Sequence, residues 1–159
     1  VDWCYDSRLA RPGELFVVRN VANLVPPYMP DALFHGTSAA VEFAVRVLQV
    51  KRIVVMGHAL CGGIRALIEG TPAEARDFVA GWIGIAEKAR AVALRCEDPV
   101  AAQEAGEQEA IRISLANLMT FPWVAEAVAA GRLTLHGAHF GVATGRLVLV
   151  PAQGDPHAP

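Results

Sequence analysis

The sequence has little charge and few lysines, so it offers no surface that could follow a nucleic acid or an anionic membrane. Charged residues make up 19% of its 159 residues, the formal net charge is −2, and its only lysines are Lys51 and Lys88. A nucleic-acid-binding domain usually carries a clustered basic patch, whereas the arginines here are scattered along the chain. The composition therefore predicts no nucleic-acid partner and no electrostatic attachment to a membrane.

Long uninterrupted apolar runs are also missing, although hydrophobic residues make up 53% of the chain. Asn117, Pro122 and Glu126 interrupt the best candidate for a membrane-spanning stretch, and a spanning helix needs about 20 consecutive apolar residues. The sequence predicts no membrane partner. Large apolar patches on proteins without a membrane anchor usually mark association sites, so the excess apolar surface predicts a homo-oligomer.

Cysteine is scarce, and its number is odd. Three cysteines cannot all pair within one chain, which argues against a disulfide framework. The visible N-terminus shows no signal-peptide pattern. Reduced thiols are typical of the cytosol, so the sequence predicts a cytoplasmic protein.

Short β-branched runs alternate with helical patterns, which favours the α/β class. The apolar runs at 15–18 and 53–56 are typical of strands in a mostly parallel sheet that is buried on both faces. We expect a single domain over residues 1–159, with a mostly parallel central sheet flanked by helices. Further strands are predicted at 133–136 and 147–150, and helices at 38–48, 61–69, 74–95, 99–119 and 122–131.

Two motifs carry possible metal ligands. Cys4, Asp6 and Arg8 are spaced by two, so in an extended segment they project to the same side. His58 and Cys61 lie across a predicted strand-to-helix turn and can converge on one ion. Two thiolates and one imidazole form a zinc site that can keep a position open for water, which points to hydrolytic or hydration chemistry.

Neighbouring residues support that interpretation. Arg8 can form a bidentate pair with Asp6, which favours the ionised carboxylate, and Gly62 and Gly63 allow the backbone to approach closely. Other interpretations explain less. A thiol hydrolase with Cys61 as nucleophile leaves the first motif unexplained. We expect structural roles for the remaining candidates, Cys96, His136 and His139.

The order of the motifs resembles the β-class carbonic anhydrases. Beyond CxDxR at 4–8 and HxxCGG at 58–63, the resemblance includes PGELFVVRNVAN at 12–23, HGTSAAVEFAV at 35–45, EAIRxSLxNL at 109–118 and LHG at 135–137. Each motif alone is weak, but their number and order make the joint signal specific.

The resemblance implies a zinc enzyme that reversibly hydrates carbon dioxide to bicarbonate and a proton by way of zinc-bound hydroxide. It implies Cys4, His58 and Cys61 as zinc ligands, and Asp6 and Arg8 as the catalytic pair. In a closed form Asp6 takes the fourth zinc position. The family also implies a homodimer or tetramer with the site near the interface.

The resemblance places an apolar substrate pocket at Phe16, Val21, Phe43 and Gly62. The family pattern has more chain around the first motif: here residues 1–3 precede Cys4, and residues 9–11 separate Arg8 from the next motif. It therefore implies that the N-terminal helices and part of the loop after Arg8 are absent.

Two alternatives use the same ligands. One is a related hydrolase of carbon disulfide or another heterocumulene on the same scaffold. The other is a non-catalytic structural zinc protein in which Asp6 closes the site permanently. Sequence motifs do not separate these functions, since a shared fold does not guarantee a shared activity.

Overall fold

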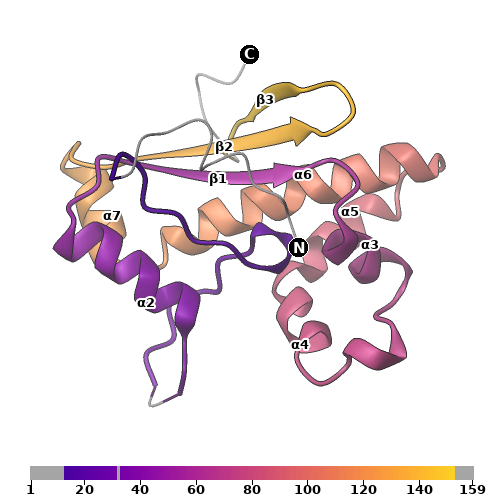
Figure 1. Ribbon diagram of the computed structural model, residues 1–159, viewed down its shortest axis with the longest axis horizontal. Helices are drawn as coiled ribbons and strands as arrows, with labels where there is room; N and C mark the ends of the chain where they lie inside the picture. The colour runs from indigo at the N-terminus through magenta and orange to yellow at the C-terminus, as the bar shows by residue number, and fades with distance from the viewer. Residues whose placement is uncertain (1–12, 32, 153–159) are drawn as a thin grey trace.

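The computed structural model describes residues 13–31 and 33–152, and these form a sheet with helices packed beneath it (Figure 1). The strands are β1 (Arg52–His58), β2 (Thr134–Gly141) and β3 (Arg146–Val150), in the order β1-β2-β3. β1 runs parallel to β2, with His58 opposite Phe140, and β2 runs antiparallel to β3.

The longer helices lie mainly between β1 and β2 in the sequence, because a parallel pair needs a long crossover. The α-helices are α2 (Gly36–Glu42), α3 (Gly62–Glu69), α4 (Val79–Ile83), α5 (Glu87–Ala93), α6 (Pro99–Leu118) and α7 (Pro122–Ala129). The short segments of other helix types are η1 (Val21–Asn23), η2 (Phe43–Val47), η3 (Ala73–Ala75) and η4 (Gly84–Ala86).

The predicted α/β class is confirmed, and the described sheet is mixed. β3 returns antiparallel because it follows β2 through a tight turn, in which Gly145 has φ +67° and donates its N–H to the oxygen of Gly141 at 2.8 Å. Both late strands are present, and β2 extends beyond the predicted 133–136. All labelled helices lie on one side of the sheet in Figure 1.

The strand predicted at 15–18 is wrong. The segment has no regular secondary structure, and its apolar side chains are exposed, as at Leu15 (58%) and Val17 (46%). A strand needs a neighbour that takes up its backbone hydrogen bonds. Within the described residues, β1 pairs with β2 alone, so no ladder incorporates this segment.

The helix predicted over 74–95 is divided into η3, α4, η4 and α5. Gly81 lies within α4, and Gly84 ends it and begins η4. Glycine in a helix interior costs about 1 kcal/mol relative to alanine, so two glycines three residues apart weaken continuous helix. The helical pattern in the sequence is correct, and the break between α4 and η4 falls at Gly84. The break between η3 and α4, at residues 76–78, contains no glycine.

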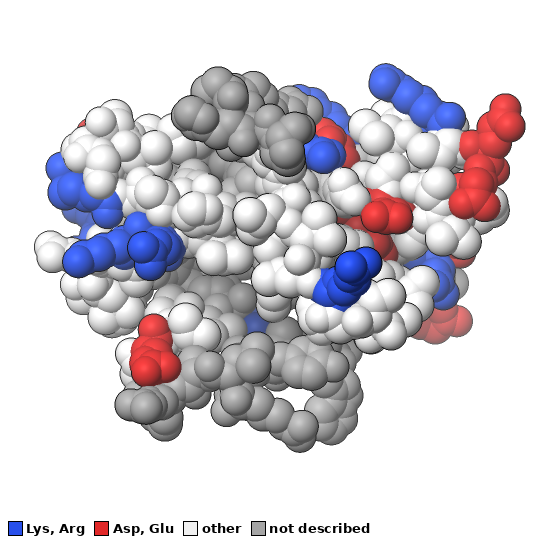
Figure 2. Space-filling model, turned by 90° about the horizontal axis from the view of Figure 1, so that it is seen from above, with Lys and Arg blue, Asp and Glu red and all other residues white. Residues whose placement is uncertain are grey.

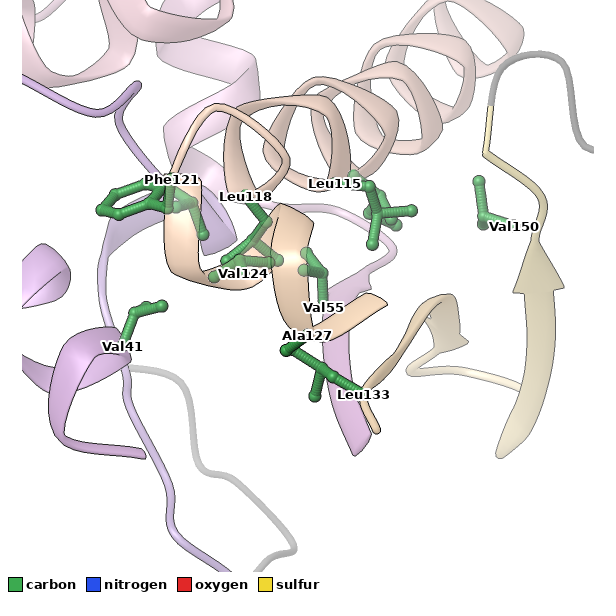
Figure 3. Close-up of a cluster of buried hydrophobic side chains, with 11 residues drawn as sticks. Val41, Val55, Leu115, Leu118, Phe121, Val124, Ala127, Leu133 and Val150 are labelled. Carbon is green, nitrogen blue, oxygen red and sulfur yellow. The ribbon is translucent and has the colours of Figure 1, made fainter. Parts of the chain in front are cut away.

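The central helix is α6, which contributes to both hydrophobic clusters of the core. Its start is fixed by Asp98, which accepts a hydrogen bond from the Ala101 N–H at 2.8 Å, and by Pro99 in the first turn. The cluster beneath the sheet joins α6 and α7 to the strands (Figure 3). Its labelled members are Val41, Val55, Leu115, Leu118, Phe121, Val124, Ala127, Leu133 and Val150.

The second hydrophobic cluster lies where α3, α4 and α5 meet α6. It includes Leu24, Cys61, Ile64 and Ala110, all at most 3% exposed. Cys61 therefore belongs to the core as well as to the candidate site, because it lies at the junction of β1 and α3. The candidate site therefore lies directly on this hydrophobic cluster.

The sheet face opposite the helices is apolar. Val54 and Met56 on β1 are 57% and 46% exposed, and Leu149 on β3 is 74% exposed. Seen from that side, most Lys, Arg, Asp and Glu side chains lie toward the ends of the molecule (Figure 2). Among the described helices, none combines the length and apolar character that crossing a bilayer requires.

Candidate functional site

The candidate site is built on the turn that leaves β1 and enters α3. His58 is the last residue of β1, and Cys61 directly precedes α3. Sites in α/β folds usually lie at the carboxyl ends of strands, where the chain turns into the next helix. Between the two residues, Leu60 adopts φ +62°, in the left-handed region, which allows the chain to reverse within two residues.

The imidazole of His58 is oriented by its own turn. Nδ1 lies 2.9 Å from the carbonyl oxygen of Ala59. Since a carbonyl can only accept, Nδ1 carries the hydrogen and Nε2 is the basic nitrogen of the neutral ring. A metal-binding histidine typically shows this arrangement, with the second nitrogen donating to a carbonyl or carboxylate.

The thiol of Cys61 is 3% exposed and lies at the N-terminal end of α3. The partial positive charge of a helix N-terminus favours a thiolate over a neutral thiol. A buried side chain also has few rotamers, so its sulfur occupies a defined position. Cys61 is thus a well-positioned candidate for a metal ligand.

The two glycines after Cys61 differ in their surroundings. A Cβ on Gly63 would lie 2.8 Å from Cγ1 of Val21 and 3.0 Å from Cβ of Ala22. A Cβ on Gly62 would meet nothing within 4 Å. The close approach expected from the glycine pair is therefore made by Gly63, and it brings Val21 to the start of α3.

Among the predicted pocket residues, Phe16 and Phe43 touch each other, whereas Val21 packs against Gly63 rather than Gly62. Val21 lies beside Gly63, next to Gly62, and the Val21 carbonyl accepts a hydrogen bond from Trp82 Nε1 at 2.7 Å. Phe16 and Phe43 are in ring contact, with centroids 5.9 Å apart and planes tilted by 36°. Val21, Phe16 and Phe43 are each partly exposed, at 43–46%.

The predicted residues Cys4, Asp6 and Arg8 lie outside the described residues. Within 13–31 and 33–152, no three His, Cys, Asp or Glu side chains are grouped so that they could hold a metal ion. The described part of the site thus supplies two donors, the imidazole of His58 and the thiol of Cys61. Both donors fit zinc, which favours nitrogen and sulfur ligands.

Sequence reasoning missed a buried polar group beneath the turn. Glu107 of α6 is 2% exposed and bonds to the backbone N–H of Cys61, to Gln103 and to His139. A signal was present, because Glu107 falls on the same helical stripe as the buried residues Ala110 and Ser114. A charged residue on the buried face of a helix indicates a specific polar partner, because a buried charge without one is costly. His139, for which the sequence predicted a structural role, contacts this carboxylate.

The chain is similar to known proteins over most of its length. The family model described as carbonic anhydrase matches residues 3–147. A carbonic anhydrase from Pseudomonas aeruginosa is 42% identical over 156 residues, which cover 91% of this chain and 69% of that protein. The chloroplastic beta carbonic anhydrase 5 of Arabidopsis thaliana is 39% identical over 149 residues, covering 86% of this chain and 48% of the relative.

The solved structures place the fold in the same group. The tetrameric β-carbonic anhydrases of Sordaria macrospora include a chain that superposes with a TM-score of 0.76 at 29% identity, covering 89% of this chain and 71% of that one. The present chain spans about half the length of its Arabidopsis relative. With 145 residues matched by the family model and the turn from His58 to Cys61 formed at the end of β1, the chain belongs to the β-class carbonic anhydrase family.

Proposed function

We propose that the protein reversibly hydrates carbon dioxide to bicarbonate and a proton at a zinc ion held by Cys4, His58 and Cys61. The observation that carries this proposal is the turn at the end of β1. His58 presents its basic Nε2 there, because Nδ1 donates to the Ala59 carbonyl. The buried thiol of Cys61 follows three residues later. When bound, zinc supplies a Lewis acid that makes a water molecule more acidic, a chemistry for which carbonic anhydrases are the standard example.

Asp6 and Arg8 complete the proposed site. The carboxylate of Asp6 accepts a hydrogen bond from the attacking water and orients it. Arg8 holds that carboxylate by a bidentate pair and keeps it ionised. In a closed form of the site, Asp6 would itself serve as a zinc ligand.

Carbon dioxide is small, uncharged and apolar, so it suits a pocket lined by hydrocarbon. We assign the pocket to Phe16, Val21, Phe43 and Gly62. The contact between the Phe16 and Phe43 rings and the packing of Val21 against the start of α3 support this assignment.

We propose that the chain works as a homodimer or tetramer with the site near the interface. Its support is the amount of apolar surface outside the core, including Phe16, Phe43 and the open sheet face at Val54 and Met56. The related Sordaria macrospora proteins are tetrameric. Sedimentation of the purified protein as a monomer at micromolar concentration would contradict the assembly.

The three cysteines support a reducing, cytoplasmic location.

Stopped-flow measurement of carbon dioxide hydration tests the function directly. The zinc-loaded protein is assayed near neutral pH and at a clearly alkaline pH, and activity is expected to rise with pH as Asp6 leaves the metal. Zinc content is measured on the same samples. Full zinc occupancy without hydration at either pH would refute the proposal and favour a structural zinc site. Faster turnover of carbon disulfide than of carbon dioxide would instead favour the related heterocumulene hydrolase.

A further inference from the structure

The backbone of Cys61 is held from both sides by polar side chains of α6. Its N–H donates to Oε1 of Glu107 at 2.8 Å. Nε2 of Gln103 donates to the Cys61 carbonyl at 3.0 Å and to the same Glu107 oxygen at 2.7 Å. Gln103 and Glu107 are four residues apart and so lie on one face of the helix. Glu107 thus holds the peptide group before Cys61, and Gln103 holds the peptide group after it.

The second oxygen of Glu107 connects the clamp to β2. Oε2 lies 2.9 Å from Nε2 of His139, and both side chains are buried. The next residue, Phe140, accepts a hydrogen bond from the Ala59 N–H at 2.8 Å through its carbonyl oxygen. A continuous set of contacts therefore runs from Ala59 through β2 and α6 to Cys61, and it brackets the turn at both ends.

The middle of that turn is strained. Leu60 has φ +62°, a conformation that costs a leucine about 1–2 kcal/mol, and its side chain is 63% exposed. Packing of Leu60 therefore does not compensate for the strain. Residues in such conformations persist when the surrounding structure fixes them. Here the fixing contacts are the hydrogen bonds at Ala59 and Cys61.

A buried carboxylate is an expensive way to stabilise a fold. Removing the charge from water costs several kcal/mol, and a well-packed apolar side chain of similar size is often as stable or more so. Glu107 has its described hydrogen bonds with the Cys61 backbone, Gln103 and His139. This arrangement fixes the backbone position of one proposed metal ligand.

We propose that Glu107, with Gln103 and His139, is a positioning residue that presets the His58–Cys61 turn for the metal. This inference rests on the proposed function, since it takes Cys61 and His58 as zinc ligands. Outer-shell partners of metal ligands typically contribute about 10- to 100-fold in metal affinity. The effect of Glu107 acts through the backbone of Cys61, so it should appear in the zinc dissociation constant even where no turnover is measured.

The test measures zinc dissociation constants of the full chain by competition with a chromophoric chelator. Glu107→Leu removes all contacts of the carboxylate, and we expect the dissociation constant to rise about 10-fold or more. Glu107→Gln keeps one oxygen that can accept from the Cys61 N–H, so it should restore most of the affinity. Gln103→Leu removes the contact to the Cys61 carbonyl and should give an intermediate loss, which keeps the test open if Glu107→Leu does not fold.

Two controls separate positioning from general destabilisation. Glu104→Gln removes a carboxylate from an exposed position of the same helix, and it should leave the zinc dissociation constant unchanged. Ser114→Ala removes a buried polar contact of α6 away from the turn, so it should lower the melting temperature without weakening zinc binding.

The possible outcomes are distinct. If Glu107→Leu and Gln103→Leu bind zinc within about threefold of the parent, or if Ser114→Ala loses as much affinity as they do, the positioning role is refuted while the proposed function stands. If the parent chain itself binds no zinc, both proposals fail. A loss confined to the Glu107 and Gln103 variants, with recovery in Glu107→Gln, supports the inference.

Discussion

The backbone of Gly63 packs so closely against Val21 that a Cβ at residue 63 would lie 2.8 Å from the Val21 Cγ1 atom. Real Cβ atoms essentially never make such a contact, so the first turn of α3 would have to move away from η1. We therefore predict that Gly63→Ala lowers the free energy of unfolding by about 1–3 kcal/mol, as overpacking of a core typically does. Urea denaturation followed by circular dichroism measures this change.

The adjacent residue provides the matched control. A Cβ at Gly62 would meet nothing within 4 Å, and alanine is the better helix former by about 1 kcal/mol. Gly62→Ala should therefore be as stable as the parent or slightly more so. A Gly63→Ala variant with the stability of Gly62→Ala would show that this close packing is not required.

Zinc binding should depend on one of the two described cysteines. Cys61 is buried at the start of α3, whereas Cys96 follows α5 and has no role in the proposed site. If Cys61 is a thiolate ligand, Cys61→Ser should lower the zinc content measured by atomic absorption to a small fraction of the parent value, because the neutral hydroxyl of serine is a poor zinc ligand. Cys96→Ser should retain full zinc content. Equal zinc content in both variants would remove Cys61 from the ligand set.

The strain at Leu60 can be tested through stability. Glycine populates φ near +60° as readily as negative φ, so Leu60→Gly relieves the strain, and the exposed leucine side chain gives up little packing. Glycine also loses more backbone entropy on folding, which offsets part of the gain. We expect the free energy of unfolding to stay level or rise by up to about 1 kcal/mol. A loss of more than about 1 kcal/mol would mean that the Leu60 side chain makes stabilising contacts.

The sequence predicted the elements that depend on local pattern and on short apolar runs. β1, α3 and α6 lie close to their predicted ranges because β-branched runs and helical periodicity are local signals. The strand at 15–18 failed because strand formation depends on a partner elsewhere in the chain. The apolar pattern of that segment is correct, but pattern alone does not supply a hydrogen-bonding neighbour.

The candidate site divides in the same way. His58 and Cys61 could be proposed as ligands from the sequence because metal ligands have restricted residue types and spacings. The contact between Cys61 and Glu107 joins residues 46 positions apart, and no short motif encodes it. The tautomer of His58 follows from the carbonyl of Ala59, which is a consequence of the turn geometry and so becomes visible only in the structure.

Ser114 links α6 to the segment that precedes α2, and its removal should destabilise the fold. Its Oγ accepts from the Val25 N–H at 3.1 Å and donates to the Asn23 carbonyl at 3.0 Å, and the side chain is fully buried. Ser114→Ala leaves both backbone groups without this partner. An unsatisfied buried group costs about 1–3 kcal/mol, so we expect a loss of that order in the free energy of unfolding.

Thr120 provides the comparison, because it makes similar contacts at the surface. Its Oγ1 accepts from the Tyr28 N–H at 2.8 Å and donates to the Asn117 carbonyl at 2.6 Å, but the residue is exposed. Water can replace a lost hydroxyl there, so Thr120→Ala should cost less than about 1 kcal/mol. The difference between the two variants measures the effect of burial on otherwise similar hydrogen bonds. Equal losses would indicate that Ser114 stabilises the fold no more than an exposed hydroxyl does.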